Sequence, residues 1–179
     1  MKLSYTASER DQGRKIYGIL KGELRLSASQ IKLLKTAGGI TLDGNVAFTT
    51  QRVAAGQLVE ADLTLSERPP EFPPEAGALD VIYDAGGLLA VNKPAGMLSH
   101  PSRSRYSGTL ANLAAGYLLE YYSDPCCHLV NRLDRDTSGI VLFARNAHLK
   151  RLAALALAAE GSYKEYTPTF SESSILIPE

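Results

Sequence analysis

The segment 128–139 carries the side chains of this chain that are best suited to chemistry. Two aspartates, Asp134 and Asp136, lie in it among arginines and hydroxyl side chains, and an apolar run follows directly. A nearby positive charge favours the ionised form of a carboxyl group, so the arginines are expected to keep an aspartate ionised at neutral pH. An ionised carboxylate can act as a nucleophile. The segment is therefore a candidate catalytic loop.

The same residues also suit a salt-bridged turn without catalytic function. Thr137 and Ser138 can hydrogen-bond to the backbone and fix the loop. Gly139 permits a backbone conformation or a close approach that a side chain would block. Charged loops with paired residues occur in many proteins that use them only for structure. Residue chemistry alone leaves both interpretations open.

The elements around this loop can be predicted from apolar periodicity. The run from Ile140 to Ala144 is compact and apolar, which indicates a central, buried strand directly after the loop. The other elements expected in this part are strands at 81–83 and 88–91, helices at 109–122 and from about 146 to 160, and a returning strand at 163–166. Mixed α and β content follows.

A proline-rich stretch at 68–75 separates a second set of elements from the first. Its four prolines favour extended backbone, so it is expected to be a linker. Before it, the sequence predicts helices at 14–20 and 29–36, a hairpin at 40–46 and a half-buried strand at 58–63, with Ser27 or Ser29 as the cap of the second helix. The chain is thus expected to have two parts.

Composition and charge limit the class of protein. With 45% hydrophobic and 21% charged residues the chain is expected to fold, and it has no apolar run of the roughly 20 residues that a membrane span needs. No apolar leader opens the sequence, so a cytoplasmic location is expected. The net charge is zero, but up to residue 35 eight basic residues face three acidic ones. A basic N-terminal surface is the natural candidate for contact with RNA.

The two cysteines are adjacent in the sequence, at Cys126 and Cys127. Neighbouring positions are poor geometry for a disulfide, and the pair lacks the spacing of a zinc site. Both are expected to be reduced structural thiols, with no metal bound.

The sequence Arg-Leu-Asp-Arg-Asp-Thr-Ser-Gly at 132–139 resembles the signature of the RluA/RluD-type RNA pseudouridine synthases. Three further segments resemble that family in the expected order: the strand and turn at 89–97, the His-Pro pair at 100–101, and Lys-Glu-Tyr at 164–166. Residues 27–59 resemble, more loosely, an S-four-like RNA-binding module.

The resemblance implies an isomerase that converts uridine to pseudouridine in ribosomal or transfer RNA, without a cofactor or a metal. Asp134 would be the catalytic nucleophile. Arg132 would fill the gap left by the extruded nucleotide, and Tyr166 would lie against the flipped uracil. Arg135 and Thr137 would be further contacts to the RNA substrate. Lys93, His100 and His128 are expected to be loop or structural residues rather than acid–base catalysts.

The fold expected from this resemblance is α+β. It would comprise a small helix-plus-hairpin, S-four-like RNA-binding domain at 1–66, a Pro-rich linker at 67–78, and the N-terminal part of a mixed, mainly antiparallel-sheet catalytic domain at 79–179. The protein is expected to bind RNA, to have no membrane contact and to be a monomer.

The sequence departs from the family pattern at two places. Asn131 stands where many members have histidine, and after Tyr166 a proline at 168 interrupts the expected strand. The family's later Gly-Arg-x-His-Gln-Ile-Arg segment does not appear, so the sequence is interpreted as a truncated or frameshifted member with an incomplete catalytic sheet.

Two alternative functions stay open. One is a catalytically inactive, truncated RNA-binding protein in which the basic N-terminal part does the work. The other is a hydrolase that uses Asp134 and Asp136, although glycosidases place such a pair across a cleft rather than in one short loop.

Overall fold

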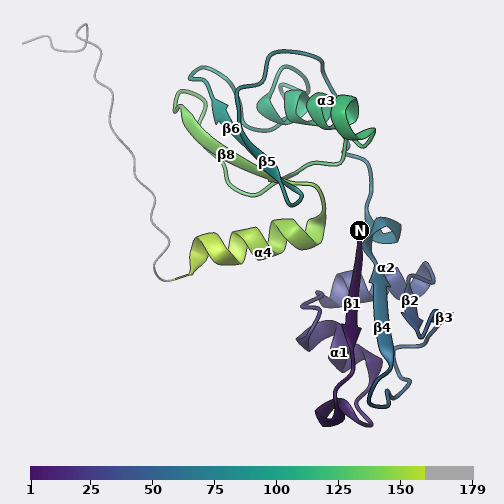
Figure 1. The fold of residues 1–179 in the computed structure, drawn as a ribbon. Coiled ribbons are helices and arrows are strands. Elements are labelled where there is room, and N and C mark those ends of the chain that lie inside the picture. Colours follow the sequence, from purple (N-terminus) through teal and green to yellow (C-terminus); the bar gives the residue numbers. More distant parts are fainter. Residues whose placement is uncertain (160–179) are drawn as a thin grey trace, which may run out of the picture.

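Two four-stranded antiparallel sheets organise the chain (Figure 1), whose computed structural model describes residues 1–159. The first sheet belongs to the N-terminal part, at the lower right of Figure 1, and the second to the part that follows it. The α+β class with mainly antiparallel sheets is thereby confirmed. The strand predicted at 163–166, and with it Tyr166, lies outside the described residues. Within those residues, no helix is long and apolar enough to cross a membrane.

The N-terminal sheet has the strand order β1-β4-β2-β3 and packs against two helices. Its elements are β1 (Lys2–Thr6), β2 (Ile40–Leu42), β3 (Asn45–Val46), β4 (Leu58–Asp62), α1 (Ile16–Gly22) and α2 (Ala28–Thr36), with 3₁₀ turns η1 (Glu9–Asp11) and η2 (Leu63–Ser66). Strand β1 was not among the predicted elements, and it pairs along its whole length with β4. Its residues alternate between exposed and half-buried positions, but a run of five residues carries this period-two signal only weakly.

Local residue choices explain two boundaries in this part. The Ser27 hydroxyl accepts a hydrogen bond from the Gln30 backbone N–H at 3.2 Å, which caps α2 as predicted. Asp43 and Gly44 both have positive φ, at 50° and 81°, as a two-residue hairpin turn between β2 and β3 requires. The domain boundary at residue 66 stays a prediction, but a separate core of buried residues, from Ala7 to Leu63, fills this part.

The second sheet has the strand order β5-β6-β8-β7. Its elements are β5 (Val81–Ala85), β6 (Leu88–Lys93), α3 (Leu110–Tyr122), β7 (His128–Leu129), β8 (Gly139–Ala144) and α4 (Ala147–Ala158). Buried side chains from β6 and β8 pack against the apolar face of α3: Leu89, Val91, Val141 and Phe143 from the strands, and Leu110, Ala114 and Leu118 from the helix. The two predicted helices of this part start where expected, and the two-residue strand β7 was not predicted.

Strand β8 lies between two neighbours, but only one of its faces is buried. Val141 and Phe143 have no exposed surface, whereas Ile140 is 59% exposed. Successive side chains of a strand point to opposite faces, and α3 covers just one of them. The prediction of a buried central strand therefore holds for the α3-facing side alone.

The proline-rich segment has no helix or strand, yet it is not a free linker. Phe72 belongs to the second core, and the Asn112 side chain donates to the Pro73 carbonyl at 2.8 Å. The Glu75 N–H donates to the Asn112 carbonyl at 2.9 Å. The segment is thus fastened along α3. Its close approach explains why the middle of that helix holds Gly116, since a β-carbon there would overlap the Glu75 backbone carbonyl.

Gly116→Ala should therefore destabilise the protein, although alanine is the better helix former. The overlap with Glu75 should cost about 1–3 kcal/mol of unfolding free energy, the usual range for overpacking. Gly18→Ala in α1 is the matched control, because a β-carbon there would meet only the Arg14 guanidinium at 3.9 Å. That change should stabilise the protein by up to about 1 kcal/mol. Urea unfolding of both variants measures the difference, and equal stabilisation by both would contradict the packing of this segment on α3.

Candidate active site

The loop between β7 and β8 carries four of the five residues expected to act on RNA. Arg132, Asp134 and Arg135 are exposed, and Thr137 is half-buried. A backbone hydrogen bond from the Thr137 N–H to the Asp134 carbonyl, at 3.2 Å, closes a turn at the tip. The carboxylate of Asp134 is thus open to solvent rather than covered by packed neighbours. The fifth residue, Tyr166, lies outside the part of the chain that is described.

The first anchor of this loop is Asn131. Its Oδ1 accepts from the Leu142 N–H at 2.8 Å, and its Nδ2 donates to the Ile140 carbonyl at 3.2 Å. The Val130 N–H also donates to the Leu142 carbonyl, at 2.8 Å. The side chain of Asn131 therefore continues the pairing of β7 with β8 into the start of the loop. The asparagine noted as a departure from the family pattern has a structural role here.

The second anchor is Ser99, which is 4% exposed. Its hydroxyl donates to the Leu133 carbonyl at 2.7 Å and accepts from the Leu133 N–H at 3.3 Å. One side chain thereby satisfies both backbone groups of the residue that precedes Asp134. Leu133 itself packs against the second core, so the backbone on this side of Asp134 is fixed from two directions.

The third anchor is Lys93, a fully buried residue at the end of β6. Its Nζ donates to the carbonyl oxygens of Pro94, Met97 and Arg135, at 2.9, 2.8 and 2.9 Å. An ammonium group has three protons, and here each has a partner. The ammonium therefore joins the turn after β6 to the backbone just beyond Asp134.

The electrostatics of the loop differ from the prediction in one respect. Among residues 1–159, no ion pair links Asp134 or Asp136 to an arginine. Arg135 instead donates through Nε to the Gly96 carbonyl at 3.1 Å. The charged group that interacts with both aspartates is Lys93: burial lowers the pKa of its ammonium, and the negative charges of Asp136 and Asp134 partly oppose that shift. The arginines were the visible signal in the sequence, whereas this lysine lies in another segment.

Arg132 lies on the wall of a groove next to the loop. The groove has a volume of about 790 Å³, and its lining includes Phe72, His100 and Asn131. The rings of Phe72 and His100 meet edge to face, with centroids 5.2 Å apart. Asp134 is not among the lining residues, so the groove adjoins the loop at Asn131 and Arg132 and not at Asp134 itself.

The chain is similar in sequence to known RNA pseudouridine synthases. Residues 87–174 match the RNA pseudouridylate synthase family. The chain is 33% identical over 145 residues to the "Uncharacterized RNA pseudouridine synthase YhcT" of Bacillus subtilis, covering 80% of this chain and 47% of that protein. It is 30% identical over 169 residues to "Ribosomal large subunit pseudouridine synthase D" of Yersinia pestis, covering 93% of this chain and 51% of that protein. The chain thus spans about half the length of these curated relatives.

Two solved structures are similar over parts of the chain. "Human RNA Pseudouridylate Synthase Domain Containing 4" has a TM-score of 0.36 at 18% identity, over 44% of this chain and 29% of that one. A structure titled "Crystal structure of pseudouridylate synthase" has a TM-score of 0.29 at 17% identity, over 76% of this chain and 50% of that one.

The anchoring role of Lys93 can be tested with Lys93→Met, which keeps a long, unbranched side chain and removes its charge. Three buried carbonyl contacts would be lost, so the unfolding free energy should fall by about 1–3 kcal/mol, as for a hydrogen-bonded charged group. Amide hydrogen exchange at 133–138 should become faster. Lys150→Met, at an exposed lysine of α4, is the control and should stay within about 0.5 kcal/mol. Identical stability and exchange in the two variants would show that Lys93 does not hold the loop.

Proposed function

The chain belongs to the RluA/RluD-type RNA pseudouridine synthases, and we propose that it isomerises uridine to pseudouridine in ribosomal or transfer RNA with Asp134 as the nucleophile. The observation that carries this proposal is the exposed Asp134 on a loop fastened by Asn131, Ser99 and Lys93. A catalytic carboxylate must reach a sugar or base without losing its position. The exposed carboxylate of Asp134 is accessible to a nucleotide, and the three anchors hold its backbone in a fixed position.

The proposed reaction leaves the atomic composition of the nucleotide unchanged. Asp134 attacks the uridine, the bond between the ring nitrogen and the sugar breaks, and the base rotates before it rejoins through carbon. The carbon that forms the new bond loses a proton, and the released ring nitrogen gains one. The carboxylate is then set free again. Because the overall reaction is an isomerisation, it consumes no second reactant. The nucleophile must be held in place throughout, and the hydrogen bond from Lys93 to the Arg135 carbonyl fixes the backbone beside it.

Access to the target requires the uridine to leave its base stack, at a cost of a few kcal/mol. Arg132 is suited to fill the vacated space, because it is exposed two residues before Asp134 and lies on the groove wall. Arg135 and Thr137 complete the proposed contacts to RNA from the same loop. Tyr166 is proposed, from the family resemblance alone, to stack on the flipped uracil.

The proposal assigns RNA binding to the N-terminal part as well. Residues 1–66 would form an S-four-like RNA-binding domain, 67–78 the connection, and the following residues the catalytic domain. The excess of basic over acidic residues up to position 35 supports this division of roles. It would place an RNA-binding surface on one part and the reacting nucleotide on the other, with the protein acting as a monomer in the cytoplasm.

Asp134→Asn is the decisive variant, because the amide has the same shape and no nucleophilic charge. In cells that lack the gene, the wild-type gene should restore pseudouridines in ribosomal or transfer RNA. The variant should reduce their rate of formation by roughly 10³-fold or more, as when one member of a catalytic unit is removed. Binding of the purified protein to the same RNA should persist.

Asp136→Asn is the matched control in the same loop, and it should keep most of the activity. Equal loss in both variants would favour two cooperating carboxylates over a single nucleophile. If no pseudouridine depends on the gene while the protein still binds RNA, the chain is an RNA-binding protein without this activity and the proposal fails.

A further inference from the structure

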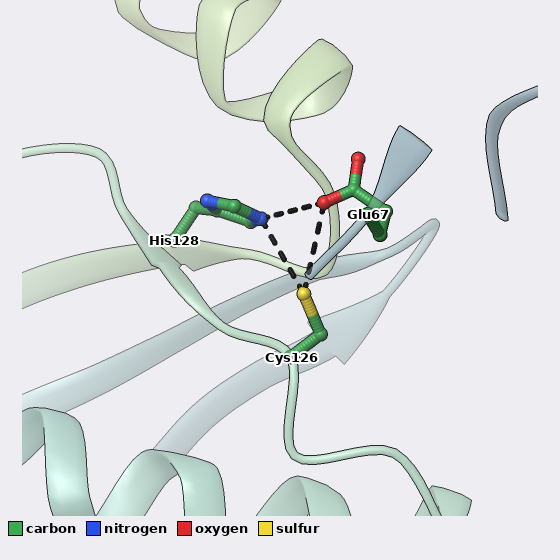
Figure 2. A group of neighbouring side chains, drawn as sticks. All are labelled: Glu67, Cys126 and His128. Atoms are coloured by element: carbon green, nitrogen blue, oxygen red, sulfur yellow. Dashed lines mark hydrogen bonds and ion pairs between the residues drawn. The ribbon is translucent and has the colours of Figure 1, made fainter. Parts of the chain in front are cut away.

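Three side chains with metal-binding atoms converge between the two parts of the chain: Glu67, Cys126 and His128 (Figure 2). His128 Nε2 lies 2.8 Å from Glu67 Oε2 and 3.4 Å from Cys126 Sγ, and Sγ lies 3.7 Å from Oε2. Figure 2 shows the nitrogen, oxygen and sulfur atoms pointing toward a common centre. Glu67 precedes Cys126 by 59 residues, so the three residues do not form a recognisable metal-binding motif in the sequence.

We propose that these three residues form a binding site for a divalent transition metal, with Zn²⁺ as the preferred ion. Imidazole nitrogen, thiolate sulfur and carboxylate oxygen are the three ligand types that Zn²⁺ takes in proteins. Tetrahedral bonds of about 2.0–2.3 Å place neighbouring ligand atoms roughly 3.3–3.8 Å apart. The two distances to Sγ, 3.4 and 3.7 Å, lie in that range. The Glu67–His128 distance is that of a hydrogen bond and would open slightly when a metal takes its place.

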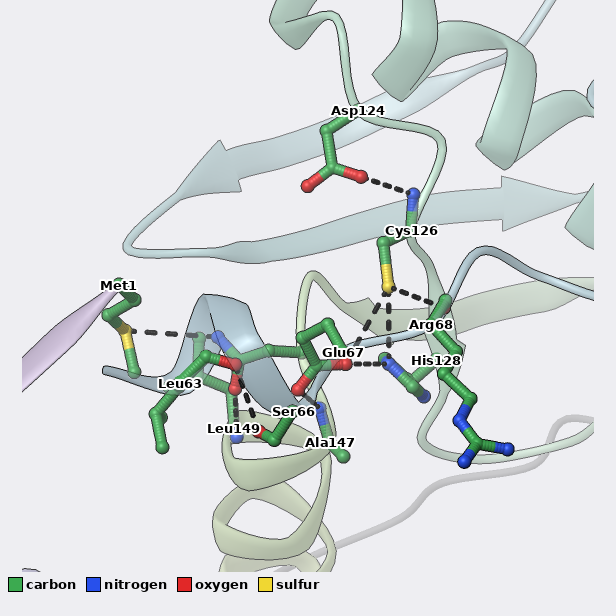
Figure 3. A network of polar contacts seen from close by, with 11 residues as sticks. Met1, Leu63, Ser66, Glu67, Arg68, Asp124, Cys126, His128, Ala147 and Leu149 are labelled. Atoms are coloured by element: carbon green, nitrogen blue, oxygen red, sulfur yellow. Dashed lines mark hydrogen bonds and ion pairs between the residues drawn. The ribbon is translucent and has the colours of Figure 1, made fainter. Parts of the chain in front are cut away.

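Further hydrogen bonds hold two of the three ligand residues in place (Figure 3). Glu67 Oε1 accepts from the Ala147 N–H at the start of α4, at 3.0 Å, which leaves Oε2 directed at the centre. The Cys126 N–H donates to Asp124 Oδ1, also at 3.0 Å. Such outer contacts orient metal ligands and strengthen binding. The group is therefore set up before any ion arrives.

Charge and access are also suitable for a divalent ion. On binding, the metal–sulfur bond replaces the S–H bond of Cys126 and the thiol proton passes to solvent. The carboxylate and the thiolate then balance the two positive charges of the ion. Glu67, Asp124 and Cys126 line a cavity of about 460 Å³, which gives the ion a path and leaves room for water as a fourth ligand. An ion there would join the segment after η2 directly to β7.

The test is metal binding by the full chain, freed of metal with a chelator. Titration with Zn²⁺ in a calorimeter should show one ion bound per chain, with release of a proton. Titration with Co²⁺ should give the absorption bands of tetrahedral cobalt and of thiolate-to-cobalt charge transfer. The cobalt spectrum needs no variant, so it decides the matter even where a substitution unfolds the protein. A chain that binds neither ion, or binds Co²⁺ without a thiolate band, would overturn the proposal and leave a hydrogen-bonded cluster only.

Variants then assign the ligands. Cys126→Ser and Glu67→Gln should each weaken Zn²⁺ binding by at least about tenfold, the lower limit for disturbing even an outer contact of a metal site. Cys127→Ser is the matched control, because that adjacent buried thiol donates to the Ala111 carbonyl at 3.7 Å and is not part of the group. Its affinity should equal that of the unaltered protein. Equal weakening in the two cysteine variants would contradict the assignment of Cys126. These readouts do not depend on pseudouridine formation, so they stand apart from the proposed activity.

Discussion

The buried ammonium of Lys93 is the interaction on which the geometry of the candidate site depends. It binds two carbonyls of its own turn and one on the far side of Asp134. A fully buried lysine is costly unless its charge is satisfied, so the three carbonyls must stay where they are for the fold to persist. The same requirement fixes the backbone beside Asp134. The stability of the core and the position of the Asp134 carboxylate therefore both depend on the Lys93 ammonium. The negative charges of Asp136 and Asp134 partly offset the effect of burial on this ammonium.

Local signals in the sequence predicted most of the elements because those elements depend on nearby residues. Ser27 and Asn146 each cap the helix that follows them, with hydrogen bonds from the N–H groups of Gln30 and Leu149. The strands β1 and β7 were missed because both are short. Strand β1 has five residues, which pair with β4 at separations of 52 to 60 residues along the chain, and β7 has only two residues. Segments of this length give only a weak periodic pattern.

The candidate loop was found from its own residues, but what holds it was not. A run of aspartates, arginines and hydroxyl groups is visible in the sequence, and the family resemblance singles out Asp134. The burial of Lys93 is not visible, because an Asn-Lys-Pro turn suggests an exposed lysine and only the packed structure encloses it. Arginines next to Asp134 suggested ion pairs, yet Arg135 binds the Gly96 carbonyl instead. Residues next to one another in the sequence supply the functional groups of the loop. Contacts from distant segments determine how these groups are positioned.

The junction between the two parts bears on the same loop. Glu67 faces His128 with one carboxylate oxygen and accepts from the Ala147 N–H with the other. His128 opens β7, and Ala147 begins the helix after β8, so a single carboxylate contacts both ends of the unit that carries Asp134. The segment that follows Glu67 then runs along α3 through Phe72 and Glu75. Because these contacts lie on either side of the loop, the connecting segment is held firmly against the unit that carries Asp134. Glu67 thus fastens the start of the connecting segment to both the strand before the loop and the helix after β8.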